Sequence, residues 1–133
     1  MFPLRRLLIV ILTLTSAAAT MAADGQPITP QNAAKLVAEG KAVLVDVREP
    51  PEWKDSGVAA PAVLLPMSDF NGEQKLWKPF LAKHSDQQIL LYCRSGGRSR
   101  EVAGVLIKQG VKAANIGTLR DWTNAGLPVR KVE

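Results

Sequence analysis

Short apolar runs alternate with segments of helical periodicity along most of this chain. The runs at 42–47, 62–65 and 88–92 are rich in branched aliphatic residues, as buried strands are, and a shorter run at 114–116 predicts one more strand. Between the strands, apolar residues recur at helical spacing. The expected helices cover 30–40, 72–83, 100–110 and a turn around Trp122. This alternation predicts an α/β fold, a three-layer α/β/α domain with a mostly parallel central sheet.

Turn and cap residues indicate where these elements begin and end. Thr29 is a suitable helix N-cap because proline follows it at the first helical position, and Gly40 is a typical helix end. We expect Pro79 to start, kink or divide the helix over 72–83. The proline-rich stretch 50–61 is predicted to be a loop.

The first 23 residues carry a different pattern. Two arginines precede an apolar run over 7–14, and small residues fill most of 16–23. This order is typical of a cleaved signal peptide, and the apolar run is too short to span a bilayer as a stable helix. We therefore expect a signal peptide over 1–23, a folded domain over 24–133 and no stable membrane anchor. An uncleaved anchor is the alternative.

Charge narrows the possible partners. The chain has 17 Lys or Arg and 12 Asp or Glu residues, and without residues 1–23 the balance is 15 to 12, a net charge of +3. No long basic run interleaves with aromatic residues, so we expect no nucleic-acid partner. Cys93 and His84 are the only residues of their types, which excludes a multi-cysteine zinc site, and we expect no metal. His84 is expected to be exposed near a helix end.

Cys93 opens the run Cys93-Arg94-Ser95-Gly96-Gly97-Arg98-Ser99, which joins a predicted strand to a predicted helix. A thiol at this junction lies among backbone N–H groups at the positive end of a helix dipole, and both lower its pKa. The arginines add positive charge, and the glycines allow a tight curl of the backbone. A lone cysteine is often a buried apolar filler. A filler does not need these surroundings, so we interpret Cys93 as a nucleophile.

Three motifs resemble those of rhodanese domains and follow the order of that family. The family's opening motif is matched by Asp46-Val47-Arg48-Glu49 with Glu52-Trp53. Its active-site loop is matched by Tyr92 to Ser99. Its closing segment is matched by Gly117 with Trp122 and Ala125 to Val129. Together they cover nearly all of the chain after residue 23. With its expected signal peptide, the chain is similar to the small single-domain rhodaneses of the bacterial periplasm.

The resemblance implies a sulfurtransferase of the thiosulfate:cyanide type, located in the periplasm. In this family the loop thiolate attacks the outer sulfur of a small anionic donor such as thiosulfate, becomes a persulfide, and passes that sulfur to cyanide or another thiophilic acceptor. No metal or organic cofactor is required. Cys93 would be the catalytic nucleophile, and Asp46 and Arg48 would be supporting structural residues. The substrate-binding residues would be Arg94, Ser95, Gly96, Gly97, Arg98 and Ser99.

The chain departs from the family pattern at two positions. Val58 stands where many members have a histidine, which bears on the packing of the loop. Glu52 stands where two-domain thiosulfate sulfurtransferases have a basic residue. An acid at this position weakens the attraction of a dianionic donor, so thiosulfate is expected to be a poor surrogate for the natural substrate.

Two other functions stay open. The first is a non-enzymatic persulfide carrier or binding module, which uses Cys93 together with a partner protein. The second is phosphatase or arsenate reductase chemistry. Related phosphatases place an arginine six positions after the cysteine, whereas Arg98 stands five after Cys93, and the shorter loop favours sulfur. Asp69, a candidate general acid, is expected to be a helix N-cap or loop residue. The three tryptophans are expected to pack in the core or in a lid.

Overall fold

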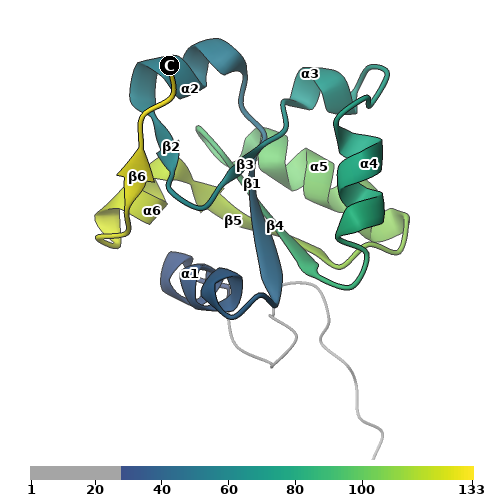
Figure 1. Ribbon diagram of the computed structural model, residues 1–133, viewed down its shortest axis with the longest axis horizontal. Coiled ribbons are helices and arrows are strands. Elements are labelled where there is room, and N and C mark those ends of the chain that lie inside the picture. The colour runs from purple at the N-terminus through teal and green to yellow at the C-terminus, as the bar shows by residue number, and fades with distance from the viewer. Residues whose placement is uncertain (1–27) are drawn as a thin grey trace, which may run out of the picture.

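The computed structural model describes residues 28–133, so the expected signal peptide lies outside the described residues. The central sheet has the strand order β3-β1-β4-β5, and every neighbouring pair is parallel (Figure 1). Its strands are β1 (Ala42–Asp46), β3 (Val63–Leu64), β4 (Gln88–Cys93) and β5 (Ala113–Thr118). The expected parallel sheet is confirmed.

Helices cover both faces of this sheet, as the three-layer prediction requires (Figure 1). One face carries α1 (Pro30–Ala38) and α6 (Leu119–Asn124), and the other carries α3 (Met67–Phe70), α4 (Trp77–Lys83) and α5 (Gly97–Lys108). At one end of the sheet lie α2 (Pro50–Ser56) and a small antiparallel sheet of β2 (Val58–Ala59) and β6 (Val129–Arg130).

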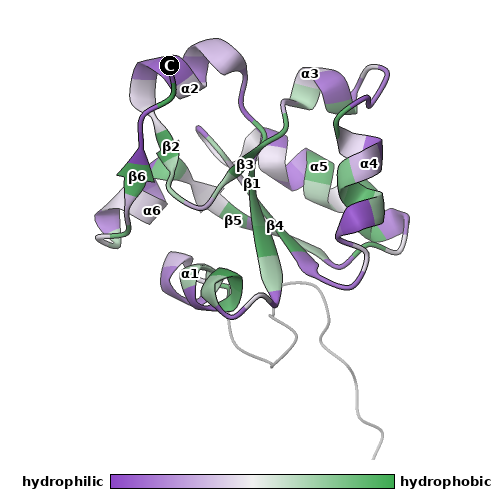
Figure 2. Cartoon of the chain, in the orientation of Figure 1, coloured by the Kyte–Doolittle hydropathy of each residue, from purple (hydrophilic) through white to green (hydrophobic). Residues whose placement is uncertain are grey.

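Alternating residues of the central strands enter two separate cores, because successive side chains of a strand point to opposite faces. In β4, Ile89 and Leu91 pack under α4 and α5, whereas Leu90 and Tyr92 pack under α1 and α6. Strands β1 and β4 are therefore apolar along most of their length (Figure 2). This explains why they appear in the sequence as continuous runs.

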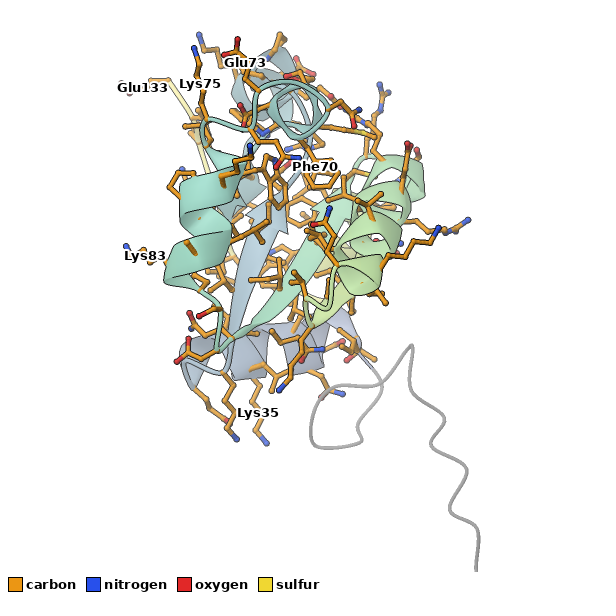
Figure 3. The ribbon with its side chains drawn as sticks, turned by 90° about the vertical axis from the view of Figure 1, so that its right-hand side faces the viewer. Lys35, Phe70, Glu73, Lys75, Lys83 and Glu133 are labelled. Atoms are coloured by element: carbon orange, nitrogen blue, oxygen red, sulfur yellow. The ribbon has the colours of Figure 1, made fainter. Side chains whose placement is uncertain are left out.

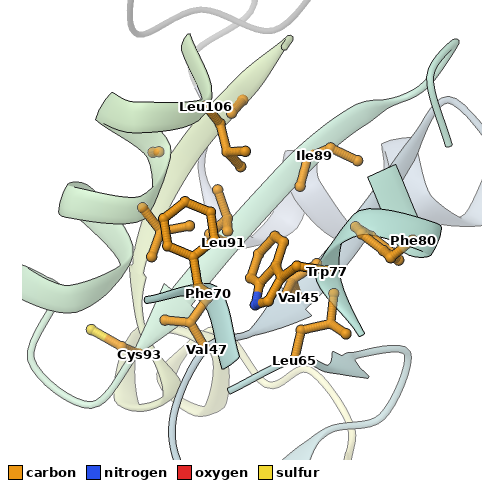
Figure 4. Close-up of a cluster of buried hydrophobic side chains, with 13 residues drawn as sticks. Val45, Val47, Leu65, Phe70, Trp77, Phe80, Ile89, Leu91, Cys93 and Leu106 are labelled. Carbon is orange, nitrogen blue, oxygen red and sulfur yellow. The ribbon is translucent and has the colours of Figure 1, made fainter. Parts of the chain in front are cut away.

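Trp77 lies at the centre of the core under α4 and α5, with no exposed surface. Its ring meets Phe70 and Phe80 edge to face, at centroid distances of 5.0 and 5.9 Å (Figure 4). Each such pair contributes about 0.5–1.5 kcal/mol beyond the burial of area. Phe70 points inward, whereas charged residues such as Lys83 point to solvent (Figure 3). Cys93 belongs to the edge of this core, so the thiol rests on a rigid base.

The prediction of a loop over 50–61 is wrong, because the first half of this stretch is helix α2. Its two prolines occupy the first helical turn, where backbone N–H groups make no intrahelical hydrogen bonds, so the lack of an N–H in proline costs nothing there. Glu49 and Glu52 form a capping box, in which the Glu49 backbone N–H donates to Glu52 Oε1 at 3.2 Å. The capping box therefore places Glu52 in the first turn of α2.

The helix predicted over 72–83 begins only at Trp77, with Pro79 in its first turn. Asp69 lies in α3, so its predicted place at an N-cap or in a loop is wrong. Its carboxylate nevertheless accepts hydrogen bonds from the backbone N–H groups of Lys75, Leu76 and Trp77, at 2.9–3.1 Å. Asp69 thus caps α4 from outside that helix, a structural role.

Other boundary predictions are closer to the structure. Thr29 Oγ1 accepts from the Asn32 backbone N–H at 3.1 Å, which confirms the cap of α1. The three tryptophans are buried, as expected. His84 ends α4, but its ring is half-buried against Phe80 instead of exposed. Helix α5 begins at Gly97, three residues before its predicted start.

Candidate active site

Cys93 ends β4 at the carboxyl edge of the sheet, and the residue is fully buried. Its sulfur accepts a hydrogen bond from the Gly96 backbone N–H at 3.0 Å. Gly96 makes this approach with a φ of +90°, a left-handed conformation that side chains with a Cβ adopt at a cost. The next residue, Gly97, starts α5. The chain therefore turns directly around the thiol into the N-terminus of a helix.

Ser99 stands beside the sulfur on the first turn of α5 and is also fully buried. Its Oγ lies 3.3 Å from Cys93 Sγ and 2.7 Å from Oδ1 of Asn115 on β5. The Asn115 side-chain amide donates to the Gly96 carbonyl at 3.3 Å. Asn115 thus fixes the middle and the last residue of the cysteine loop to the sheet. The sequence prediction did not include it.

Hydrogen bonds to the sulfur of Cys93 affect the pKa of its thiol more than burial does. Burial raises the pKa of the Cys93 thiol, but hydrogen bonds from the Ser99 hydroxyl and from backbone N–H groups of Ser99, Ser95 and Gly96 lower it by more. The thiol pKa is therefore below its usual value. A thiolate is the nucleophilic form of cysteine, so this loop favours nucleophilic chemistry at Cys93.

Arg98, expected to bind an anionic substrate, is held by Glu52 of α2. Its Nη1 and Nη2 donate to Oε1 and Oε2 at 2.6 and 2.8 Å, a bidentate ion pair. The hydrogen bond from Arg98 lowers the pKa of Glu52 to about 2, so the carboxylate stays charged at any physiological pH. The guanidinium charge of Arg98 is consequently balanced before any ligand arrives, while Arg94 is exposed.

Asp46 and Arg48 form a second, buried ion pair at the end of β1. The Arg48 guanidinium donates to the Asp46 carboxylate at 2.9–3.1 Å, and its remaining N–H groups donate to Ser56 Oγ and the Gly57 carbonyl at 2.7 and 2.6 Å. The two residues are 0 and 2% exposed. This pair ties α2 to the central sheet, so it supports the helix that carries Glu52.

An open pocket of about 630 Å³ lies beside the cysteine loop, between α2 and α6. Thr118, one of its lining residues, is the direct partner of Cys93 across the β4–β5 pairing. Nine of the lining residues are polar or charged, and only Leu119 is aliphatic. The full lining consists of Arg48, Glu52, Asp55, Ser56, Arg94, Thr118, Leu119, Arg120, Thr123 and Asn124. The pocket therefore offers a polar approach to the loop.

Of the sequence-predicted loop residues, the structure brings Ser95, Gly96 and Ser99 to the sulfur of Cys93. Arg98 is directed to Glu52 and Arg94 to solvent, and Asp46 and Arg48 form a support. Val58 is fully buried in β2, where it packs instead of forming polar contacts. Among residues 28–133, no three His, Cys, Asp or Glu side chains gather in a way that could hold a metal ion. Within the same residues, no helix has the length and apolar character needed to cross a membrane.

Comparison with known proteins gives one consistent family. The rhodanese-like domain family matches residues 29–125. A probable adenylyltransferase/sulfurtransferase from Mycobacterium tuberculosis, MoeZ, is 35% identical over 97 residues, which are 72% of this chain and 24% of that protein. A putative mitochondrial thiosulfate sulfurtransferase from Schizosaccharomyces pombe is 35% identical over 82 residues, 56% of each chain. The chain thus spans between about a quarter and about half of these relatives.

A solved structure supports the fold. A human single-domain sulfurtransferase superposes with a TM-score of 0.60 at 23% identity, covering 80% of this chain and 97% of that chain. At this identity the likeness concerns the arrangement of the elements. It agrees with the parallel sheet and its covering helices described above.

Proposed function

Because the chain belongs to the rhodanese family, we propose that it is a sulfurtransferase that carries sulfane sulfur as a persulfide on Cys93. The observation that carries this proposal is the cradle around the sulfur, in which the Gly96 N–H donates to Sγ at 3.0 Å and the Ser99 hydroxyl oxygen lies 3.3 Å from it. The names of the two curated relatives, both sulfurtransferases, point the same way.

The first half-reaction loads the cysteine. The Cys93 thiolate attacks the outer sulfur of thiosulfate, an S–S bond forms to Cys93, and the bond between the two thiosulfate sulfurs breaks. Sulfite leaves with the electron pair of that bond, so a thiolate and a dianion become a persulfide anion and a dianion. Backbone N–H groups of the loop stabilise the persulfide charge, as an oxyanion hole stabilises a developing alkoxide.

The second half-reaction removes the outer sulfur from the Cys93 persulfide. A thiophilic acceptor such as cyanide attacks the outer persulfide sulfur, and the Cys93 thiolate leaves with the electron pair. The products are thiocyanate and the original thiolate, so no oxidant, reductant, metal or organic cofactor takes part. The lowered pKa of the Cys93 thiol favours this step too, because a more acidic thiol is a better leaving group.

A non-enzymatic persulfide carrier, which delivers sulfur to a partner protein, is the second candidate. The Arg98–Glu52 ion pair favours it over rapid turnover of thiosulfate, because the loop arginine is already occupied. We also propose that the protein acts in the periplasm. That proposal rests on the signal-peptide pattern of residues 1–23.

A turnover assay tests the proposal. The purified protein is incubated with thiosulfate and cyanide, and thiocyanate is measured against a Cys93→Ser variant. Multiple turnovers in the wild type and none in the variant support the enzyme. A single turnover followed by a stable persulfide supports the carrier. Equal thiocyanate release from both proteins contradicts both functions.

A further inference from the structure

Glu52 changes what the cysteine loop can bind. Its carboxylate occupies two N–H donors of Arg98, at 2.6 and 2.8 Å, as a bidentate pair. The side chains of Arg98 and Glu52 remain 32% and 26% exposed, and Glu52 lines the pocket beside the loop. An incoming donor therefore meets a carboxylate next to the arginine that would otherwise bind it.

A dianion is affected most by this arrangement. To bind Arg98, thiosulfate must displace the Glu52 carboxylate or approach a group of the same sign, and both cost free energy. Protonation does not remove the obstacle, because the pKa of Glu52 is about 2. The loop is therefore poorly arranged for small inorganic dianions.

The adjoining pocket suits a larger ligand. Its volume of about 630 Å³ falls within the range of about 300–1,000 Å³ that is usual for small organic ligands. Of its charged lining residues, Arg48 and Glu52 are each held in an ion pair. Arg94 and Arg120 add positive charge to the lining, and Asp55 adds negative charge. A ligand with both an ammonium and a carboxylate group matches this mixture of charges better than a dianion does.

We propose that Glu52 is a specificity-determining residue that turns the loop away from inorganic dianionic donors and toward zwitterionic organic persulfides, whose organic part occupies the pocket between α2 and α6. This inference rests on the proposed sulfur transfer at Cys93 and names the donor class for that site. It also assigns the pocket a role, which is to hold the part of the donor that does not react.

The loading step balances without a further reactant. The Cys93 thiolate attacks the outer sulfur of R–S–SH, a new S–S bond forms to Cys93, and the S–S bond of the donor breaks. The thiolate R–S⁻ leaves and takes up the proton of the transferred sulfur. Cys93 is left as a persulfide anion and the donor as the thiol R–SH.

The test measures loading in a single turnover. Reduced protein is mixed with thiosulfate or with cysteine persulfide generated in situ, and the gain of one sulfur atom is followed over time by intact mass. Glu52→Gln keeps the shape of the side chain and removes its charge. Glu101→Gln, on the exposed side of α5, is the matched control because it changes the net charge of the protein equally. The double variant Glu52→Gln/Arg98→Gln asks whether any gain requires the released arginine.

We expect Glu52→Gln to raise the loading rate from thiosulfate about tenfold, which corresponds to ~1.4 kcal/mol. Loading from cysteine persulfide should change by no more than about twofold, because the reacting R–S–SH form of this zwitterion carries no net charge. The gain with thiosulfate should be absent in Glu101→Gln and lost in the double variant. An unchanged donor preference in Glu52→Gln, or the same change in Glu101→Gln, overturns the inference but leaves sulfur transfer intact. Failure of the wild type to load from either donor overturns the proposed function itself.

Discussion

The Ser99 hydroxyl oxygen lies 3.3 Å from the Cys93 sulfur, and both residues are fully buried. Oδ1 of Asn115, on β5, lies 2.7 Å from the same oxygen. The position of the hydroxyl next to the thiol is thus set by the packing of α5 on β5, not by the loop alone. The reactivity of the cysteine is therefore a property of the folded domain.

Removal of this hydroxyl should make the thiol less acidic. The Ser99→Ala variant loses a hydrogen bond that favours the thiolate, so the pKa of Cys93 should rise and its alkylation at neutral pH should slow. The pH dependence of iodoacetamide alkylation measures this directly. Ser95→Ala is the control, because Ser95 acts through its backbone N–H, which alanine keeps. An unchanged alkylation profile in Ser99→Ala contradicts the role of the hydroxyl.

The two adjacent glycines of the loop should respond differently to substitution. Gly96 has a φ of +90°, so Gly96→Ala should lower the free energy of unfolding by about 1–2 kcal/mol. Gly97 has an ordinary φ and open space around its Cα, so Gly97→Ala should be neutral or stabilise the protein by up to about 1 kcal/mol. Urea unfolding compares the two variants. Equal effects would show that the left-handed turn at Gly96 is not required.

The buried pair behind the loop should matter mainly for stability. Arg48→Ala leaves the Asp46 carboxylate buried without its partner, which should cost about 3–5 kcal/mol. Arg100→Ala removes an exposed arginine from α5 and should change the free energy of unfolding by less than about 0.5 kcal/mol. Urea unfolding of both variants measures these changes in the free energy of unfolding. A small loss in Arg48→Ala would contradict the structural role of the pair.

The Glu52–Arg98 pair should stabilise the fold in a defined pH range. The pKa of Glu52 falls from 4.5 to about 2 on folding, so its contribution is fully present above about 4.5 and is lost as the pH falls to about 2. At neutral pH, Glu52→Gln should be less stable than the wild type by about 1–2 kcal/mol. Urea unfolding at decreasing pH should show this difference disappear.

A surface pair provides the comparison for that experiment. Lys75 and Glu73 are 79% and 75% exposed, so Glu73→Gln should change stability by less than about 1 kcal/mol. A stability difference between the wild type and Glu52→Gln that does not depend on pH would contradict the ionic character of the Glu52–Arg98 contact.

The junction that carries Cys93 could be predicted from the sequence because its signals are local. A continuous apolar run marks β4, paired glycines mark the turn, and helical spacing marks α5. Helix α2 was missed although its signal is also local. The proline content of 50–61 predicts a loop, whereas Glu49 and Glu52 form a capping box at the start of a helix whose first turn accepts the two prolines.

The contacts that tune the site could not be predicted, because they join distant parts of the chain. Ser99 and Asn115 are 16 residues apart, and Glu52 and Arg98 are 46 apart. Asn115 is a half-buried residue of β5 with no motif around it, so only the packing of α5 on that strand shows its role. The family resemblance placed Glu52 near the site but not on Arg98.

The intact mass of the protein after exposure to a sulfur donor tests the central claim most directly. Wild type and Cys93→Ser are each treated with thiosulfate or with cysteine persulfide, and the excess donor is removed. The intact mass of each protein is then measured before and after cyanide is added. The account predicts a gain of one sulfur atom in the wild type, its loss on addition of cyanide, and no gain in Cys93→Ser. Sulfur gained by the serine variant, or none gained by the folded and reduced wild type, would contradict a persulfide on Cys93.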